Sequence, residues 1–384
     1  MAITADEVST DEVPCYPASV PPFTPHFLFK VGEVRYDALA ELERRQSGEV
    51  LLLARRRVRK ETLPGRCFVR RLPNPTTYMR RRRLVEEVQL AFRLSHPAIA
   101  QVHHLGIYDD ALHVVMEYVP GPSVETLVTA GVVRGHPLSE AFALYLGAEL
   151  AEALHHAHTA VDEDGRPLGV VHRDVNPRHV VVGPHGEVKL MSFGAAFSLL
   201  VGREESPESL VRGDVAYASP EYIRRDSLTP RSDVFGLGVL LVELLTGTHL
   251  FDVADVPRLP PGRPLRAEAI PSLPLKQMRA LLASFGPDSV EKAVAGLAPD
   301  VKVILHKALR ANPEERFASA AELRDALRVA QSLRSESYGR QDAAAEVAQV
   351  LAEGGRLRDK VEFGEVGLYP EGLDAHELIV AEDE

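Results

Sequence analysis

The residues best suited to chemistry fall in two short runs near the middle of the chain. The first run, HRDVNPRH over residues 172–179, contains Asp174, and the second, SFG over residues 192–194, ends a strand-like apolar segment. A carboxylate such as Asp174 can act as a general base that orients a hydroxyl group and accepts its proton. A single aspartate is a weak sign of catalysis, so the surrounding pattern has to decide whether this chemistry is present.

The elements that precede these runs form a first group over about residues 31–118. Short β-like runs over residues 49–53, 66–69 and 112–116 surround one helical stretch over residues 78–94. Apolar residues recur in that stretch close to the period of a helix. This pattern predicts a small sheet with one helix.

A second group of elements, over about residues 119–333, is mainly helical. Amphipathic stretches begin at Ser139 and Ser319, two residues of the type that caps helix N-termini, and Glu322 has the spacing of a capping box with Ser319. The chain therefore predicts an α+β fold in which a sheet lobe is followed by a helical lobe, both within residues 31–333.

Both ends of the chain differ in composition from this central part. Residues 1–30 are rich in Pro, acidic residues, Ser and Thr, which predicts a disordered arm. Residues 334–384 predict a short helix that stops at Gly354 and Gly355, followed by an acidic tail over residues 361–384 that acts as a mobile or docking strip.

The composition restricts the partners and the compartment. With 44 Lys and Arg against 55 Asp and Glu, the net charge is −11, which argues against nucleic acid as a partner. The longest apolar run, residues 234–245, contains Glu243 and is shorter than the roughly 20 residues that span a membrane. Cys15 and Cys67 lie far apart and suggest no disulfide framework. We expect a cytoplasmic protein without a membrane span.

The two runs resemble the catalytic and metal-binding loops of eukaryotic-like protein kinases. The sequences of these motifs are most similar to those of bacterial Ser/Thr kinases. The resemblance continues in register through residues 218–221, 232–238 and 312–317, and covers about residues 36–333. It implies a two-lobed protein-kinase-like fold, with an antiparallel N-lobe sheet plus one helix at about residues 31–118 and a mainly helical C-lobe. It also implies transfer of the ATP γ-phosphate to protein hydroxyl groups.

The resemblance assigns a role to each matching position. The nucleotide-binding positions are Glu43, Arg45, Gly48, Val50, Arg70, Glu87, Met116, Glu117 and Val119. The metal positions are His179 and Ser192, and the catalytic-loop positions are Asp174, as the base, and Asn176. The structural positions are His172, Arg173, Phe193, Gly194, Glu221, Asp233 and Arg316, with Glu221 and Arg316 expected to form a buried ion pair.

Several of the catalytic positions depart from the family pattern, and each departure removes a group that phosphoryl transfer uses. The glycine-rich loop keeps only Gly48, and Arg70 replaces the strand lysine. His179 replaces the metal-binding asparagine and Ser192 the metal-binding aspartate, whereas Mg²⁺ prefers oxygen ligands, charged ones in particular. The scaffold is kept while the chemistry is lost. The sequence therefore predicts a pseudokinase that acts as a scaffold or allosteric regulator, with protein partners in a signalling pathway.

Other interpretations stay open. One is an active or slow Ser/Thr kinase that uses ATP with Mg²⁺ or Mn²⁺ through atypical ligands, and another is a nucleotide sensor that binds ATP without metal. In the pseudokinase interpretation ATP is an optional cofactor and the divalent ion binds weakly if at all. The basic runs over residues 55–60 and 80–83 either form a solvated face or bind an acidic partner, the acidic tail or a phosphate-bearing ligand.

Overall fold

The computed structural model describes residues 24–44, 48, 50–59, 61–73, 89–191, 193, 196, 198, 214–251, 275–334 and 337–363. The acidic tail from residue 364 and most of the helix expected over residues 78–94 lie outside the described residues. The first 23 residues of the expected N-terminal arm lie outside them as well.

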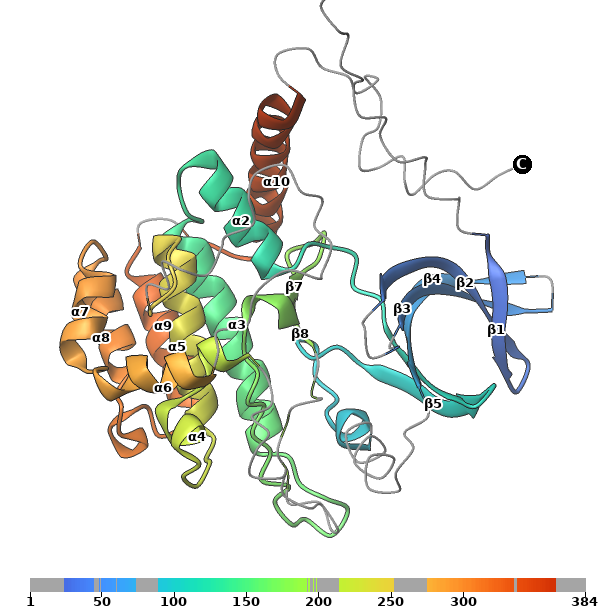
Figure 1. Ribbon diagram of the computed structural model, residues 1–384, viewed down its shortest axis with the longest axis horizontal. Coiled ribbons are helices and arrows are strands. Elements are labelled where there is room, and N and C mark those ends of the chain that lie inside the picture. Colours follow the sequence, from blue (N-terminus) through green and yellow to red (C-terminus); the bar gives the residue numbers. More distant parts are fainter. Residues whose placement is uncertain are drawn as a thin grey trace, which may run out of the picture.

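Six strands form one curled antiparallel sheet in the order β1-β2-β3-β4-β6-β5 (Figure 1). The strands are β1 (His26–Val31), β2 (Val34–Arg44), β3 (Val50–Val58), β4 (Glu61–Pro73), β5 (Val102–Tyr108) and β6 (Ala111–Glu117). Side chains alternate between the two faces of each strand, and one face is filled by buried residues such as Leu52 and Val69. This sheet is the N-lobe that the sequence predicted.

Strand β1 begins inside the segment that composition assigned to a disordered arm. Phe29 is 2% exposed and stacks on Tyr108 with ring centroids 4.2 Å apart, and β1 pairs with β2 along its length. The boundary expected at residue 30 therefore lies too late. The prediction extended the proline-rich composition of the preceding residues into β1. Burial of Phe29 against other aromatic residues stabilises this short strand.

The remaining described elements form a mainly helical lobe, and α3 and α5 pass through its core. The helices are α2 (Val124–Arg134), α3 (Glu140–His158), α4 (Pro220–Arg224), α5 (Arg231–Thr246), α6 (Leu275–Ala283), α7 (Pro287–Val294), α8 (Pro299–Ala308), α9 (Ala320–Ser332) and α10 (Arg340–Phe363). Short elements between them are η1 (Pro177–His179), β7 (Val180–Val182), β8 (Val188–Leu190), η3 (Val215–Tyr217) and η4 (Pro313–Glu315).

Two predicted helix starts are confirmed by their caps. The Ser139 hydroxyl accepts a hydrogen bond from the Phe142 N–H at 3.0 Å, and the Ser319 hydroxyl accepts one from the Glu322 N–H at 3.3 Å. Each bond satisfies a backbone donor that has no partner inside its helix. Local capping chemistry therefore fixes where α3 and α9 begin.

The helix expected to stop at Gly354 and Gly355 continues to Phe363 as α10. A side-chain Cβ at Gly354 would lie 2.8 Å from the Ala130 Cβ of α2, so glycine here allows two helices to approach closely. Figure 1 shows α10 beside α2. The prediction was wrong because it treated a packing glycine as a helix end.

The two lobes are joined by main-chain bonds and an ion pair. The Leu190 N–H donates to the Ala98 carbonyl at 2.8 Å, and the Ala100 N–H donates to the Leu190 carbonyl at 3.0 Å. At the end of β6, the Glu117 carboxylate lies 2.7 Å from Lys189 Nζ of β8. Among the described helices, none is both long and apolar enough to cross a membrane.

Candidate functional site

A buried carboxylate at the start of α5 holds the loop that carries Asp174. Asp233 is 1% exposed and accepts hydrogen bonds from the N–H groups of His172, at 2.7 Å, and Arg173, at 2.8 Å. His158 Nε2 of α3 lies 2.7 Å from the same carboxylate. Arg173 has a φ of 65°, a left-handed conformation that costs roughly 1–2 kcal/mol outside glycine. The bonds to Asp233 stabilise that conformation.

The protonation states around Asp233 follow from these contacts. Burial alone would raise the pKa of Asp233, but the hydrogen bonds from His158 and the Arg173 N–H outweigh it and lower that pKa. Burial lowers the pKa of His172 and favours the neutral imidazole. Its Nδ1 accepts the Asp174 N–H at 3.3 Å, so its Nε2 can donate to the Met191 carbonyl at 3.2 Å. His172 therefore links the Asp174 loop to the end of β8.

The second run of the sequence is only partly described. The Phe193 ring packs edge-on against His172, with ring centroids 4.6 Å apart. Ser192 and Gly194 lie outside the described residues. The His172–Phe193 contact still brings the two runs side by side, as their shared resemblance implied.

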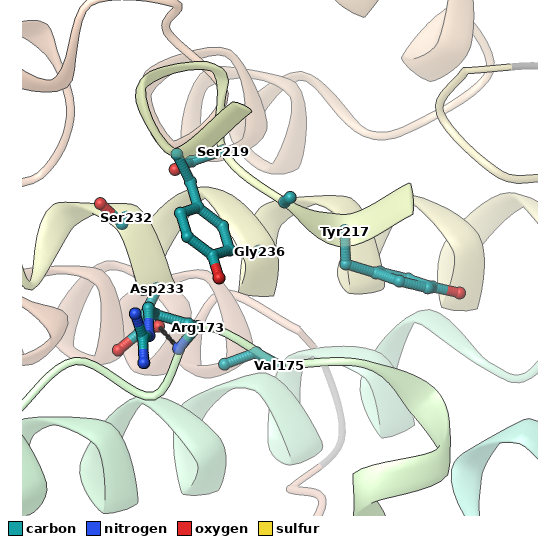
Figure 2. A pocket seen from close by; sticks show the side chains of 9 residues that line it. Arg173, Val175, Tyr217, Ser219, Ser232, Asp233 and Gly236 are labelled. Carbon is teal, nitrogen blue, oxygen red and sulfur yellow. Dashed lines mark hydrogen bonds between the residues drawn. The ribbon is translucent and has the colours of Figure 1, made fainter. Parts of the chain in front are cut away.

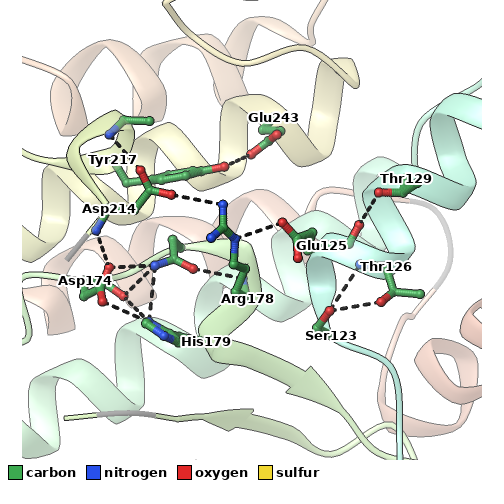
Figure 3. A network of polar contacts seen from close by, with 12 residues as sticks. Ser123, Glu125, Thr126, Thr129, Asp174, Arg178, His179, Asp214, Tyr217 and Glu243 are labelled. Carbon is green, nitrogen blue, oxygen red and sulfur yellow. Dashed lines mark hydrogen bonds and ion pairs between the residues drawn. The ribbon is translucent and has the colours of Figure 1, made fainter. Parts of the chain in front are cut away.

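The Asp174 carboxylate is held by several groups of the protein itself (Figure 3). One oxygen accepts hydrogen bonds from the Asn176 side-chain amide, at 2.7 Å, and from the Asp214 N–H, at 2.8 Å. The other oxygen lies 3.3 Å from His179 Nδ1. Asp174 itself is 8% exposed. A general base has to present a free lone pair to its substrate, and here the internal donors compete for those lone pairs.

Asp214 and Arg178 extend this network to α2. Arg178 Nε donates to Glu125 of α2 at 3.0 Å, and an Arg178 Nη lies 3.5 Å from the Asp214 carboxylate. Burial raises the pKa of Asp214, with Arg178 acting in the opposite direction. The network therefore ties the loop of Asp174 to α2 and to the segment that leads into α4.

The donor set among the described residues does not fit Mg²⁺. The His179 Nδ1 atom lies 3.1 Å from the Asp174 carbonyl oxygen and 3.2 Å from the Asn176 amide nitrogen. An imidazole in this position supplies nitrogen where a hard ion prefers oxygen. Within the described ranges no group of three or more His, Cys, Asp or Glu side chains has a metal-binding arrangement.

The expected nucleotide positions on the sheet divide between its two faces. Arg70 of β4 pairs in register with Leu51 of β3 and Val114 of β6, so these three residues share a face. Val50 is 3% exposed and belongs to the core on the opposite face. The expectation that Val50 lines the same site as Arg70 is therefore wrong, because strand alternation puts Leu51 there. Met116, paired with Phe68, lies on the Arg70 face.

The other nucleotide positions give a mixed result. The Glu117 carboxylate is engaged by Lys189 and by the Gln101 N–H at 3.1 Å, and Val119 is buried. Gly48 has a φ of 83°, which favours glycine, and the backbone of Glu43 pairs with β3. Arg45 and Glu87 lie outside the described residues, so the expected pairing of Arg70 with Glu87 stays a prediction.

Glu221 of α4 and Arg316 form the buried ion pair that the resemblance implied. Two parallel contacts of 2.7 Å join the guanidinium to the carboxylate, and the side chains are 0% and 2% exposed. The Ser232 hydroxyl also donates to Glu221, at 2.8 Å. Burial opposes ionisation of Glu221, but Arg316 outweighs it and lowers the pKa of that carboxyl. The helical scaffold keeps its ion pair.

A cavity of about 10 Å³ lies between the Asp174 loop and α5 (Figure 2). Its lining includes Arg173, Tyr217, Ser219 and Gly236. The Ser219 hydroxyl is buried and has no hydrogen-bond partner among the described residues. The space is about the size of one water molecule, so it is too small for a nucleotide.

Sequence reasoning missed four residues that shape this site: Asp214, Arg178, Glu125 and Lys189. Their types are common on surfaces, and nothing in their spacing distinguishes them. Asp214 becomes important because the chain returns to Asp174 some 40 residues later in sequence. Such a contact depends on tertiary structure and leaves no local signal.

Comparison with known proteins agrees with this geometry. The profile described as "Protein kinase domain" matches residues 58–327. The serine/threonine-protein kinase PknB of Mycobacterium leprae is 32% identical over 262 residues, 67% of this chain and 36% of the relative. The tyrosine-protein kinase MasK of Myxococcus xanthus is 32% identical over 248 residues, 63% and 34% of the two chains. The serine/threonine-protein kinase PrkC of Bacillus subtilis is 31% identical over 242 residues, 63% and 32%. The chain thus spans about a third of the length of these relatives.

Proposed function

Because this chain belongs to the protein kinase family, in its eukaryotic-like bacterial Ser/Thr branch, we propose that it is a signalling pseudokinase. It binds protein partners as a scaffold or allosteric regulator and transfers phosphate poorly or not at all. We place it in the cytoplasm.

The observation that carries the proposal is the occupied carboxylate of Asp174. Phosphoryl transfer in this family relies on a base that orients the substrate hydroxyl group. In this chain the Asn176 amide, the Asp214 N–H and His179 surround that base. A substrate hydroxyl group would have to displace at least one of these groups before it could bond to Asp174.

The metal and nucleotide positions support the same proposal. The family uses ATP with Mg²⁺ or Mn²⁺ in general, and this chain has His179 and Ser192 where the metal ligands are expected. Removal of one preorganised electrostatic group lowers a catalytic rate by about 10² to 10³. Arg70 keeps the positive charge of the strand lysine, but its planar group has different geometry. ATP is therefore an optional ligand of this protein, and its binding depends weakly, if at all, on a divalent ion.

The scaffold half of the proposal rests on the retained structural network. Asp233 still fixes the Asp174 loop, and Glu221 still pairs with Arg316. These interactions hold the helical lobe and do not require catalysis. A rigid lobe of this kind can present surfaces to other proteins.

The test is a phosphotransfer assay with radiolabelled ATP and a general protein substrate, in Mg²⁺ and in Mn²⁺. We expect no transfer from the wild type, and a metal-dependent gain in the His179→Asn/Ser192→Asp double variant if the rest of the site is intact. Adding Asp174→Asn to that variant is the matched control, since it removes the base alone. Efficient transfer by the wild type, abolished by Asp174→Asn, would show an active kinase and overturn the proposal.

Nucleotide binding is measured separately by thermal unfolding with ATP, in Mg²⁺ and in EDTA. A ligand at one hundred times its Kd stabilises a protein by about 2.7 kcal/mol. Stabilisation in EDTA with no phosphate transfer identifies a nucleotide sensor, whereas no stabilisation in either condition leaves the surfaces of the scaffold as the functional parts.

A further inference from the structure

A cluster of arginines lies on one face of the N-lobe sheet, around a single buried carboxylate. The register pairs Asp37 of β2 with Arg55 of β3, and Arg35 with Arg57, so all four side chains share a face. Arg66 of β4 pairs with Arg55 and extends this face. We call Arg35, Arg55, Arg57 and Arg66 the arginine cluster.

The nearly buried Asp37 side chain contacts three arginines of the cluster. Its side chain is 4% exposed, and its oxygens lie 2.6 Å from Arg35 Nε, 3.1 Å from Arg57 Nε and 3.8 Å from Arg55 Nε. The closest atom of each of these arginines is Nε, so the terminal nitrogens are directed away from Asp37. The Phe27 ring lies 4.5 Å from the Arg35 guanidinium and further restricts it.

The charge of the cluster is far from balanced. Four arginines share this face with the Asp37 carboxylate, and among the described residues Asp37 is the printed ion-pair partner of three of them, Arg35, Arg55 and Arg57. The side chains of Arg35, Arg55 and Arg57 are 43%, 28% and 30% exposed, so each of them is partly accessible from solvent. Guanidinium groups bind carboxylates through paired hydrogen bonds. The cluster therefore fits an acidic peptide.

We propose that the arginine cluster binds the acidic C-terminal segment of the same chain, residues 364–384. This segment has seven Asp and Glu residues and neither Lys nor Arg. It follows directly on α10, whose Ala343, Val347 and Val350 are buried in the helical lobe, so the start of the segment is anchored. A tether raises the local concentration of a ligand to about the millimolar range, which makes weak charge contacts sufficient.

The segment has a long reach from the end of α10. Its 21 residues span up to about 70 Å when extended, at roughly 3.3–3.6 Å per residue. The cluster lies on the same face of the sheet as Leu51 and Arg70, because Arg55 is four residues from Leu51 along β3 and Arg66 is four residues from Arg70 along β4. The Asp174 network of the helical lobe is not part of this contact. The test of this contact requires no phosphate transfer, because it measures only the distance between the segment and the sheet.

The experiment measures the distance between two spin labels in the full chain. One label is attached at Glu33→Cys, in the exposed turn before β2, and the other at Ala381→Cys, with Cys15→Ser in the background. Cys67 is 1% exposed and stays unlabelled in the folded protein. We expect a short, narrow distance population at low salt. Raising the salt from 0.1 M to 1 M shortens the Debye length from about 10 Å to about 3 Å and should disperse that population.

Two variants test the contact from opposite sides. Arg55→Gln/Arg57→Gln removes two charges from the cluster, and Glu382→Gln/Asp383→Asn/Glu384→Gln removes three from the segment without touching the fold. Both should abolish the short distance. The matched control is Arg166→Gln/Arg224→Gln, which removes two arginines that are 73% and 53% exposed on the helical lobe, and it should leave the distance unchanged.

Three outcomes would overturn the proposal. A broad distance distribution in the wild type at low salt would show that the segment does not bind. A short distance that survives neutralisation of the segment would assign it to another contact. A short distance that disappears on dilution with unlabelled protein would show that the segment binds a second copy of the chain.

Discussion

The buried pair of Glu221 and Arg316 allows the sharpest test of the scaffold. In Arg316→Met, Glu221 keeps the Ser232 hydroxyl as its one side-chain donor among the described residues. Three carbonyl oxygens lose a guanidinium donor: those of Arg231, Arg310 and Ala311. Breaking a buried ion pair by removing one partner costs about 3–5 kcal/mol. Because neither side chain is exposed, solvent cannot replace the lost contacts. We expect a loss of this size in the free energy of unfolding.

The assay is urea unfolding followed by circular dichroism, with Arg324→Met as the matched control. Arg324 pairs with Glu152 on the surface, where the two side chains are 19% and 32% exposed, and such pairs contribute about 0–1 kcal/mol. The double variant Glu221→Met/Arg316→Met should recover much of the stability, since it leaves no unpaired buried charge. A loss in Arg316→Met no larger than that in Arg324→Met would refute the reasoning.

Two further predictions concern pH and packing. Burial lowers the pKa of His249 from 6.5 to about 4, so the wild type should lose stability as the pH falls from 6.5 towards 4, by on the order of 3 kcal/mol from this residue. His249→Phe should lose less over the same pH range, and equal losses in urea unfolding would contradict this. In Gly186→Ala, the new Cβ would overlap the Arg340 carbonyl at the start of α10, at a position with a φ of 75°. The free energy of unfolding should fall by at least about 1 kcal/mol more than in Gly165→Ala, whose φ is 78° but whose surroundings are open. An equal fall in the two variants would show that α10 does not pack tightly against this turn.

Much of the fold follows from local signals in the sequence. The change from β-like runs to helical periodicity predicted the two lobes, and the serine caps predicted where α3 and α9 begin. These features depend on neighbouring residues, so they can be predicted without tertiary structure. Gly354 could not be interpreted in that way, because its role depends on Ala130 of a distant helix.

The site was predictable in its residue types but not in its contacts. The resemblance identified Asp174 and His179, and the structure adds that His179 and the Asp214 N–H face the same carboxylate. Val50 was misplaced because a one-residue difference in strand position reverses the face on which a side chain lies. Register is set by pairing between strands, which no single strand specifies.

The position of α3 has a consequence for the order in which the protein folds during synthesis. Gly147 of α3 packs closely against Leu327 of α9, and both helices belong to the core that includes Val350 of α10. Nearly 200 residues separate the end of α3 from Val350, which takes roughly 10–40 s to translate at about 5–20 residues per second. Until α9 has been translated, the face of α3 that packs on it has no partner, while the sheet that precedes α3 can already form. The helical lobe is therefore completed only after α9 and α10 have been translated, even though α5 can pack on α3 earlier.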